Sequence, residues 1–226
     1  MDHKSHRLEV LSQLSGFILQ VERPHPVRVA IDGIDNAGKT YLSEELANIL
    51  AASGRPVIQA SLDAFHLPKS VRYKLGPDSP EGYYLHSFNY EDLRACMLIP
   101  LGPTGNLRYQ LEIYDYRKGH PVQHESRQAE TNAILLFDGV FLLRPEIIND
   151  WDFSIFLKVS FEEALRRAIE RDRSEIGSKE AIIARYEKRY FPGQRIYLER
   201  DKPEFCADVV LDNTELDYPI LYPLCP

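Results

Sequence analysis

The feature that most constrains this chain is a glycine-containing segment between a hydrophobic run and a helical pattern. Residues 33–40 read Gly-Ile-Asp-Asn-Ala-Gly-Lys-Thr and match the spacing GxxxxGK[ST] at every fixed position. Residues 27–32 predict a strand before it, and residues 41–52 predict a helix after it. In that setting the glycines let backbone N–H groups converge, and the helix N-terminus adds positive potential. The segment therefore predicts a phosphate-binding loop, or P-loop.

This loop predicts a nucleotide site with a metal ion. Lys39 would reach the β- and γ-phosphates, and Thr40 would ligate Mg²⁺. The expected cofactors are therefore ATP and Mg²⁺, with the choice between ATP and GTP left open. The residues that we expect around the nucleotide are Gly33, Asp35, Asn36, Ala37, Gly38, Lys39, Thr40 and Tyr41.

Hydrophobic runs along the rest of the chain alternate with helical patterns. Besides 27–32, strands are expected at 56–62, 134–138, 153–159 and 207–211. The alternation favours an α/β class: a three-layer P-loop NTPase fold with a mostly parallel five-stranded sheet and a small lid. One domain over 1–226 is expected, with an N-terminal helix (1–23), a substrate-binding insert (63–126) and a lid region (161–190).

The expected insert is the segment with the weakest periodicity. Residues 63–89 are rich in Pro, Gly, Tyr and His, which predicts a long loop with short helical pieces. Loops of this length are usually functional. Residues 90–100 predict a helix, and 107–114 can pair with 121–126 as a hairpin.

Two aspartates follow predicted strands and are candidates for the chemistry. Asp138 ends the apolar run 134–137 and would face the phosphates, holding Mg²⁺ directly or through water. Asp63 ends the second strand, which we expect beside the P-loop strand, and could accept the proton of an attacking hydroxyl. Each aspartate also has a structural alternative. Asp138 could be a turn or N-cap residue before Gly139, and Asp63 could be a turn residue after the strand.

Composition excludes several other classes of protein. A formal net charge of −7 argues against a nucleic-acid partner. Three scattered cysteines argue against a disulfide framework or a zinc site and fit a reducing, cytoplasmic setting. No signal peptide and no apolar run of membrane-spanning length is apparent, so no membrane partner is expected. The expected partner is a small-molecule substrate, and a homo-oligomer is left open.

Several segments, taken in order from Val27 to about Asn213, resemble the uridine kinase family. That family lies within a wider group that includes phosphoribulokinase and bacterial pantothenate kinase. Beyond the P-loop, the resemblance rests on residues 63–66, 88–90, 114–116, 136–140, Arg167, 171–172 and 207–210.

The resemblance implies ATP-dependent phosphorylation of a hydroxyl on a small molecule, most nearly a nucleoside. Asp63 stands at the position of the family's catalytic base, and Asp138 stands where the family usually has a glutamate near Mg²⁺. Arg167 and Arg171 match lid arginines that close over the phosphates. The catalytic residues implied are Lys39, Asp63, Arg167 and Arg171.

The resemblance also implies a set of substrate-binding residues: Asp63, Phe65, His66, Tyr114, Tyr116 and His120. Tyr114 and Tyr116 stand where family aromatics contact the nucleoside. His66 replaces a family tyrosine, and the family's base-reading histidine falls near Gly119, one place before His120. These departures bear on recognition of the nucleobase more than on phosphoryl transfer.

Alternatives remain open on the residues alone. The acceptor could instead be pantothenate, nicotinamide riboside, a sugar or glycerate, and an ATP-hydrolysing regulatory P-loop protein is the alternative of another class. Arg167 and Arg171 share a helix face with acidic residues four places away, so surface ion pairs compete with a phosphate role. The later basic residues 185–195 are expected on a solvated face.

Overall fold

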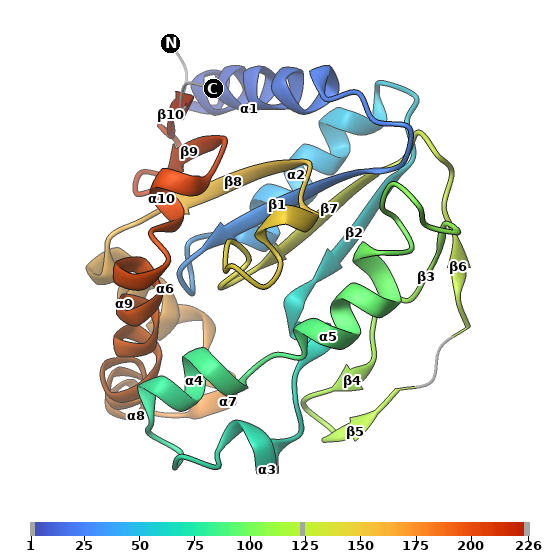
Figure 1. Ribbon diagram of the computed structural model, residues 1–226. Helices are drawn as coiled ribbons and strands as arrows, with labels where there is room; N and C mark the ends of the chain where they lie inside the picture. Colours follow the sequence, from blue (N-terminus) through green and yellow to red (C-terminus); the bar gives the residue numbers. More distant parts are fainter. Residues whose placement is uncertain (1–2, 123–124, 224–226) are drawn as a thin grey trace.

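A six-stranded sheet lies at the centre of the molecule, with its strands in the order β10-β9-β8-β1-β7-β2 (Figure 1). The computed structural model describes residues 3–122 and 125–223. The strands are β1 (Val27–Gly33), β2 (Val57–Ser61), β7 (Ile134–Gly139), β8 (Phe153–Lys158), β9 (Val209–Asp212) and β10 (Ile220–Pro223). The first five are the five expected from the sequence, and all of their pairings are parallel.

The expected count of five strands was wrong, because β10 adds a sixth. This strand runs antiparallel to β9 at the edge of the sheet. Pro219 precedes it and Pro223 ends it. Proline cannot donate to a ladder and is therefore confined to edges, so the pattern of residues 220–223 carried no strand signal.

Helices cover both faces of the sheet and make the three expected layers. One face packs against α1 (His3–Gln20), α2 (Lys39–Ala51), α6 (Phe161–Arg171) and α8 (Lys179–Arg185). The other packs against α4 (Pro80–His86), α5 (Tyr90–Leu93) and much of α9 (Phe191–Arg200). The short helices α3 (Lys69–Arg72), α7 (Arg173–Ile176) and α10 (Pro203–Cys206) connect these layers.

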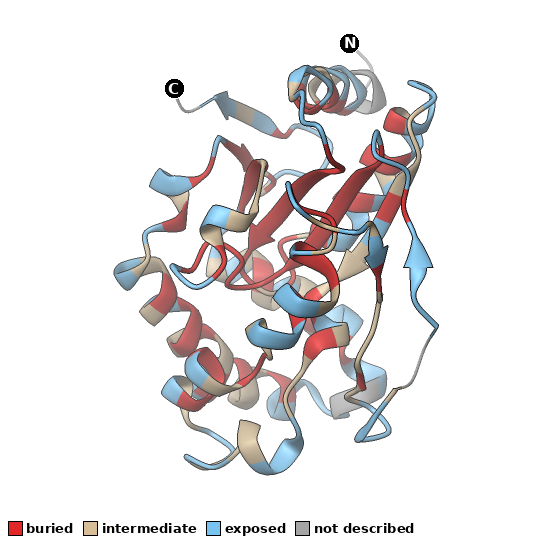
Figure 2. Ribbon diagram, turned by 45° about the vertical axis from the view of Figure 1, so that its right-hand side comes forward, coloured by how far each residue is buried: buried red, intermediate tan, exposed pale blue. Residues whose placement is uncertain are grey.

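Burial of the sheet on both faces explains why its strands are continuous apolar runs. Ile31 and Leu136 contribute to one hydrophobic core, whereas Leu135 and Phe137 contribute to the other. Every residue of β1 and β7 is buried, as Figure 2 shows for the centre of the sheet. Because the strands are parallel, their carboxyl ends meet at one edge, where ligands bind in open α/β sheets.

The expected insert consists of short pieces. A 3₁₀ turn (Leu62–Phe65) leads into α3 and α4, and α5 continues as a π-helical segment (Arg94–Leu98), so the expected helix over 90–100 is present. The expected hairpin forms as two short ladders, β4 (Tyr114–Asp115) with β5 (His120–Pro121) and β3 (Arg108–Tyr109) with β6 (Arg127–Gln128). Residues 123 and 124 of that hairpin lie outside the described residues.

The position of Asp63 differs from the expectation in two respects. The strand β2 ends at Ser61, so Asp63 lies in the following 3₁₀ turn. β2 pairs with β7 rather than with the P-loop strand, so β7 lies between β1 and β2. In this register Asp138 lies opposite both Ile31 and Ser61, at the middle of the carboxyl edge.

Helical structure continues past residue 190, where the expected lid region ends. A π-helical segment (Tyr186–Tyr190) joins α8 to α9, which runs to Arg200. Pro192 lies in the first turn of α9, where proline is tolerated. Within the described part of the chain, no helix is long and apolar enough to cross a membrane.

Candidate active site

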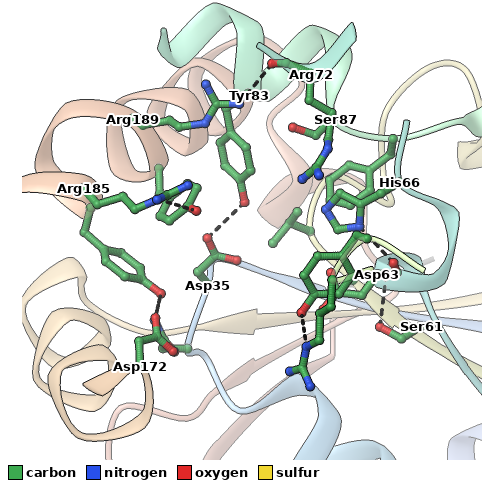
Figure 3. A pocket seen from close by; sticks show the side chains of 18 of the residues that line it. Asp35, Ser61, Asp63, His66, Arg72, Tyr83, Ser87, Asp172, Arg185 and Arg189 are labelled. Carbon is green, nitrogen blue, oxygen red and sulfur yellow. Dashed lines mark hydrogen bonds between the residues drawn. The ribbon is translucent and has the colours of Figure 1, made fainter. Parts of the chain in front are cut away.

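A cavity of about 590 Å³ lies at the carboxyl edge of the sheet. The P-loop and the end of β7 contribute to its walls, together with the insert and the segment from the end of α6 to the π-helical turn after α8. Figure 3 shows side chains from these segments pointing toward one another across the cavity. Segments far apart in the sequence therefore share one site.

The P-loop takes its shape from a left-handed glycine and its lysine. Gly38 has φ of 96°, and a Cβ there would lie 2.9 Å from the side-chain nitrogen of Asn213. The Lys39 Nζ donates to the backbone carbonyls of Gly33 and Ile34, at 3.1 and 2.8 Å. The lysine head therefore lies over the concavity of the loop.

Three oxygen-bearing side chains meet beside the P-loop. The Thr40 hydroxyl donates to the Asp138 carboxylate at 2.9 Å, and the Ser61 hydroxyl lies 3.5 Å from the same carboxylate oxygen. Burial raises the pKa of Asp138, an effect that the charge of Lys39 and the bond from Thr40 oppose. Hard oxygen donors of this kind suit Mg²⁺.

These residues alone do not surround a metal ion. Across the described ranges, no group of three or more His, Cys, Asp or Glu side chains could hold one. A Mg²⁺ held by Thr40 and Asp138 would therefore take its other ligands from phosphate oxygens and water, as Mg²⁺ usually does.

Asp63 lies across the cavity beside a wall of rings. Its backbone carbonyl lies 2.9 Å from His66 Nδ1, and its own side chain is exposed to the cavity. The His66 ring centre lies 4.5 Å from that of Phe88 and 4.8 Å from that of Tyr116. Burial lowers the pKa of His66, which favours the neutral imidazole.

A second set of contacts ties the P-loop to the helices that face it. The Tyr83 hydroxyl donates to the Asp35 carboxylate at 3.0 Å, and Tyr186 donates to Asp172 at 2.6 Å. Arg171 bonds to that same Asp172. Burial raises the pKa of Asp35, while the charge of Lys39 lowers it. Asp35 thus links the loop to α4, Asp172 links the end of α6 to the segment after α8, and the Asn36 side-chain amide joins the loop to Tyr186 at 2.9 Å.

The charge of the cavity is opposite in sign to that of the whole chain. Four aspartates line it: Asp35, Asp63, Asp138 and Asp172. Eight cationic side chains line it: Lys39, Lys69, Arg72, Arg117, Lys118, Arg171, Arg185 and Arg189. The chain as a whole carries −7, so the cations are gathered at this site. A cavity with this surplus of positive charge suits a polyphosphate.

Comparison with known proteins agrees with this geometry. The model of the phosphoribulokinase and uridine kinase family matches residues 29–214, which include the P-loop and nearly all of the cavity walls. The chain belongs to this family. Its homologues are ATP-dependent kinases of small molecules.

Relatives of this family match at low identity. The uridine kinase of Salmonella typhimurium is 27% identical over 151 residues, which cover 66% of this chain and 66% of that protein. A structure described as a possible uridine kinase from Bacillus stearothermophilus has a TM-score of 0.71 at 22% identity, covering 89% of this chain and 97% of that one. D-glycerate 3-kinase from Cryptococcus neoformans has a TM-score of 0.58 at 16% identity, covering 81% and 87%. The two structures share the fold.

The cavity brings together about half of the residues that the sequence and the family resemblance indicated. Those that line it are Asp35, Asn36, Lys39, Thr40, Asp63, His66, Tyr116, Asp138 and Arg171. Those that do not line it are Gly33, Ala37, Gly38, Tyr41, Phe65, Tyr114, His120 and Arg167. The backbone of the three loop residues in this second group still shapes the concavity.

Arg167 is the clearest departure from the family expectation. Its guanidinium donates to the carbonyls of Asn213 and Thr214 at 2.8 and 3.0 Å and to those of Asn36 and Ala37 at 3.3 Å. It also pairs with a glutamate one turn earlier in α6. In this arrangement Arg167 supports the P-loop from outside the cavity.

The other expected side chains fail to line the cavity for different reasons. Phe65 and Tyr114 are buried and pack within the protein. His120 is exposed at the start of β5, with its Nδ1 3.0 Å from the Pro121 carbonyl oxygen. Tyr41 is exposed beside the Arg7 guanidinium. Because β4 ends at Asp115, Tyr114 lies in the strand and Tyr116 lies in the turn that follows it.

Several residues that line the cavity were not predicted from the sequence. Arg185 and Arg189 were expected on a solvated face, but Arg189 is buried and both line the cavity. Their spacing of four places them on one helix face. Tyr83, Tyr186 and Arg72 were missed as well, because the insert and the π-helical segment lack a readable periodicity.

Proposed function

We propose that this protein transfers the γ-phosphoryl group of ATP to a hydroxyl of a nucleoside-sized small molecule. The observation that carries the proposal is the joint presence in one cavity of Lys39, the bonded pair Thr40–Asp138, and Asp63. Phosphoryl transfer requires a phosphate cradle, a metal site and a group that orients the attacking hydroxyl. These residues supply one of each.

The roles of the chain's own groups follow from their positions. Lys39 would exchange its two carbonyl partners for phosphate oxygens and offset their charge. Mg²⁺, when bound beside Thr40 and Asp138, would neutralise charge on the transferring group. Asp63 would orient the acceptor hydroxyl and take its proton. We expect the lid region 161–190 to help exclude water, which would otherwise hydrolyse ATP.

The size and walls of the cavity support an acceptor of nucleoside dimensions. The rings of His66, Phe88 and Tyr116 offer flat faces on the same side as Asp63. A neutral nucleoside is the first candidate, and pantothenate, nicotinamide riboside, a sugar and glycerate are the others. An ATP-hydrolysing regulatory protein would not need an acceptor-facing carboxylate.

An assay of ATP consumption against these acceptors tests the proposal. We expect ADP release that depends on at least one acceptor and on Mg²⁺, and that is lost in Lys39→Ala. Calorimetry should show ATP binding to the wild type in Mg²⁺. An ATPase rate equal with and without every acceptor would instead favour the regulatory class.

A further inference from the structure

Arg72 has a feature that the contacts within the folded protein leave unexplained. Its Nε is buried and has no hydrogen-bond partner among the described residues. Its guanidinium has no carboxylate partner there, and the one ring beneath it is that of its neighbour Tyr73, with the Cζ 5.6 Å from the ring centre. A buried donor left unpaired costs about 1–3 kcal/mol, and more when it is charged. A ligand that pairs with Arg72 would remove that cost.

The position of Arg72 indicates that the ligand that pairs with it is the acceptor. Its side chain lies between the rings of Tyr83 and His66 in Figure 3, on the side of the cavity that holds Asp63. The charge of Arg72 helps to lower the pKa of His66, whose ring bonds to the backbone of Asp63. Arg72 and Asp63, the residue of the proposed hydroxyl site, therefore both lie near His66.

The charges that the insert contributes to the cavity also favour an anionic acceptor. Within 63–126 the cavity is lined by four cationic side chains, Lys69, Arg72, Arg117 and Lys118, and by a single carboxylate, that of Asp63. Lys69 lies on α3 with Arg72, and no ion pair joins it to the described residues. The phosphates of ATP would already have Lys39 of the P-loop and Arg171 of α6, which also line the cavity. Lys118 already pairs with the Asp115 carboxylate at 3.2 Å. A neutral acceptor would leave Lys69 and Arg72 without an anionic partner among the described residues.

We infer that the acceptor carries an anionic group, a carboxylate or a phosphate, in addition to its hydroxyl, and that Arg72 binds this group. The inference rests on the proposed function and selects among its acceptors. The planar guanidinium can bind either anion through two parallel hydrogen bonds, including one from the unpaired Nε. Asp63 would then hold the hydroxyl end of the same molecule.

Matched pairs of acceptors test the inference in the full-length protein. Glycerate and glycerol, or pantothenate and pantothenol, differ by a carboxylate, and ribose 5-phosphate and ribose differ by a phosphate. We expect the anionic member of at least one pair to give kcat/KM at least about 10-fold above its neutral partner, as for a charge-assisted bond. The carboxylate and phosphate pairs distinguish the two sources of charge.

Variants then assign the effect to Arg72. Arg72→Gln should reduce kcat/KM for the preferred anionic acceptor by about 10- to 100-fold, mainly through KM, and leave the KM for ATP unchanged. Arg72→Lys should recover part of the loss. Lys74→Gln removes the same charge two residues away, at an exposed position outside the cavity, and should behave as the wild type.

Thermal unfolding separates recognition from a structural role. Without ligand, Arg72→Gln should melt at or above the wild-type temperature, because the variant buries no unpaired guanidinium. With a non-hydrolysable ATP analogue, the anionic acceptor should raise the Tm of the wild type and not that of Arg72→Gln.

Three results would overturn the inference. The first is that, in the wild type, no anionic acceptor raises the Tm more than its neutral partner does. The second is turnover of neutral acceptors that Arg72→Gln leaves intact, which would keep the kinase proposal. The third is a loss in Arg72→Gln confined to the KM for ATP, which would assign Arg72 to the nucleotide. Absence of acceptor-dependent turnover throughout would count against the proposed function, and the Tm comparison would still decide on Arg72.

Discussion

Asp63 and Asp138 are both carboxylates in one cavity, yet their surroundings differ. Asp138 is buried and bonded to Thr40, whereas Asp63 is exposed to the cavity. Asp63→Asn keeps the shape and cannot take a proton, so kcat should fall at least about 10²-fold with ATP affinity nearly unchanged. Asp138→Asn should chiefly raise the Mg²⁺ requirement. A Mg²⁺ titration of the turnover of both variants measures the difference.

The opposite pattern would reassign Asp63. If excess Mg²⁺ restores the rate of Asp63→Asn, that residue belongs to the metal site and another group must orient the hydroxyl. A loss of ATP binding in Asp63→Asn would likewise contradict the acceptor role.

Residues fixed by local spacing were the predictable part of the site. Lys39 and Thr40 follow from an eight-residue motif, and Asp138 follows from the end of an apolar strand, so all three line the cavity. Arg167 and Arg171 share a helix face, but α6 turns only Arg171 into the cavity. Sequence spacing shows which residues share a face, whereas tertiary packing decides what that face meets.

At the scale of elements, the guanidinium of Arg167 bonds α6 to the P-loop. Arg167 joins the carbonyls of Asn36 and Ala37 to those of residues 213 and 214 after β9. Arg167→Ala would leave these acceptors without their donor and should lower the free energy of unfolding by about 2 kcal/mol, with weaker ATP binding. Denaturant unfolding and calorimetry measure the two effects.

Its neighbour supplies the matched control. Arg166 lies on the same helix, exposed, and pairs only with glutamates of α6. Arg166→Ala should change stability and ATP binding little, since exposed pairs contribute little. Equal effects of the two substitutions would mean that Arg167 also acts only as a surface ion pair.

The elements themselves were predictable where periodicity was strong. The five parallel strands and α2 follow from continuous apolar runs and from the P-loop. β10 was missed because prolines flank it, and α9 was missed because a π-helical segment and Pro192 interrupt its pattern. The order of strands, with β7 between β1 and β2, depends on long-range pairing that no local pattern records.

At the scale of the whole molecule, one fully buried carboxyl makes stability depend on pH. Asp32 accepts bonds from Tyr197 and from the Leu142 amide, and burial raises its pKa from 3.8 to about 6. The folded protein therefore holds this proton more tightly than the unfolded chain does. The contribution of Asp32 to stability falls as pH rises from about 4 to 6, by up to about 3 kcal/mol.

Asp32→Asn should remove this dependence. Urea unfolding of wild type and variant at pH 4.5 and 7.5 measures it, and the variant should gain relative to the wild type at the higher pH. Parallel changes in the two proteins would show that Asp32 titrates alike in the folded and unfolded states.

The cavity carries a surplus of positive charge although the chain as a whole is acidic, and this difference makes activity depend on the anions in the buffer. Cations outnumber carboxylates eight to four in the cavity, while the chain as a whole is acidic. Sulfate and phosphate buffers would supply competitors for the same arginines and lysines, and added salt screens those cations less where they are buried. Monovalent salt should therefore slow the reaction gently, whereas millimolar sulfate inhibits it in competition with its anionic ligands. The choice of buffer anion would then change the apparent KM for ATP and for an anionic acceptor.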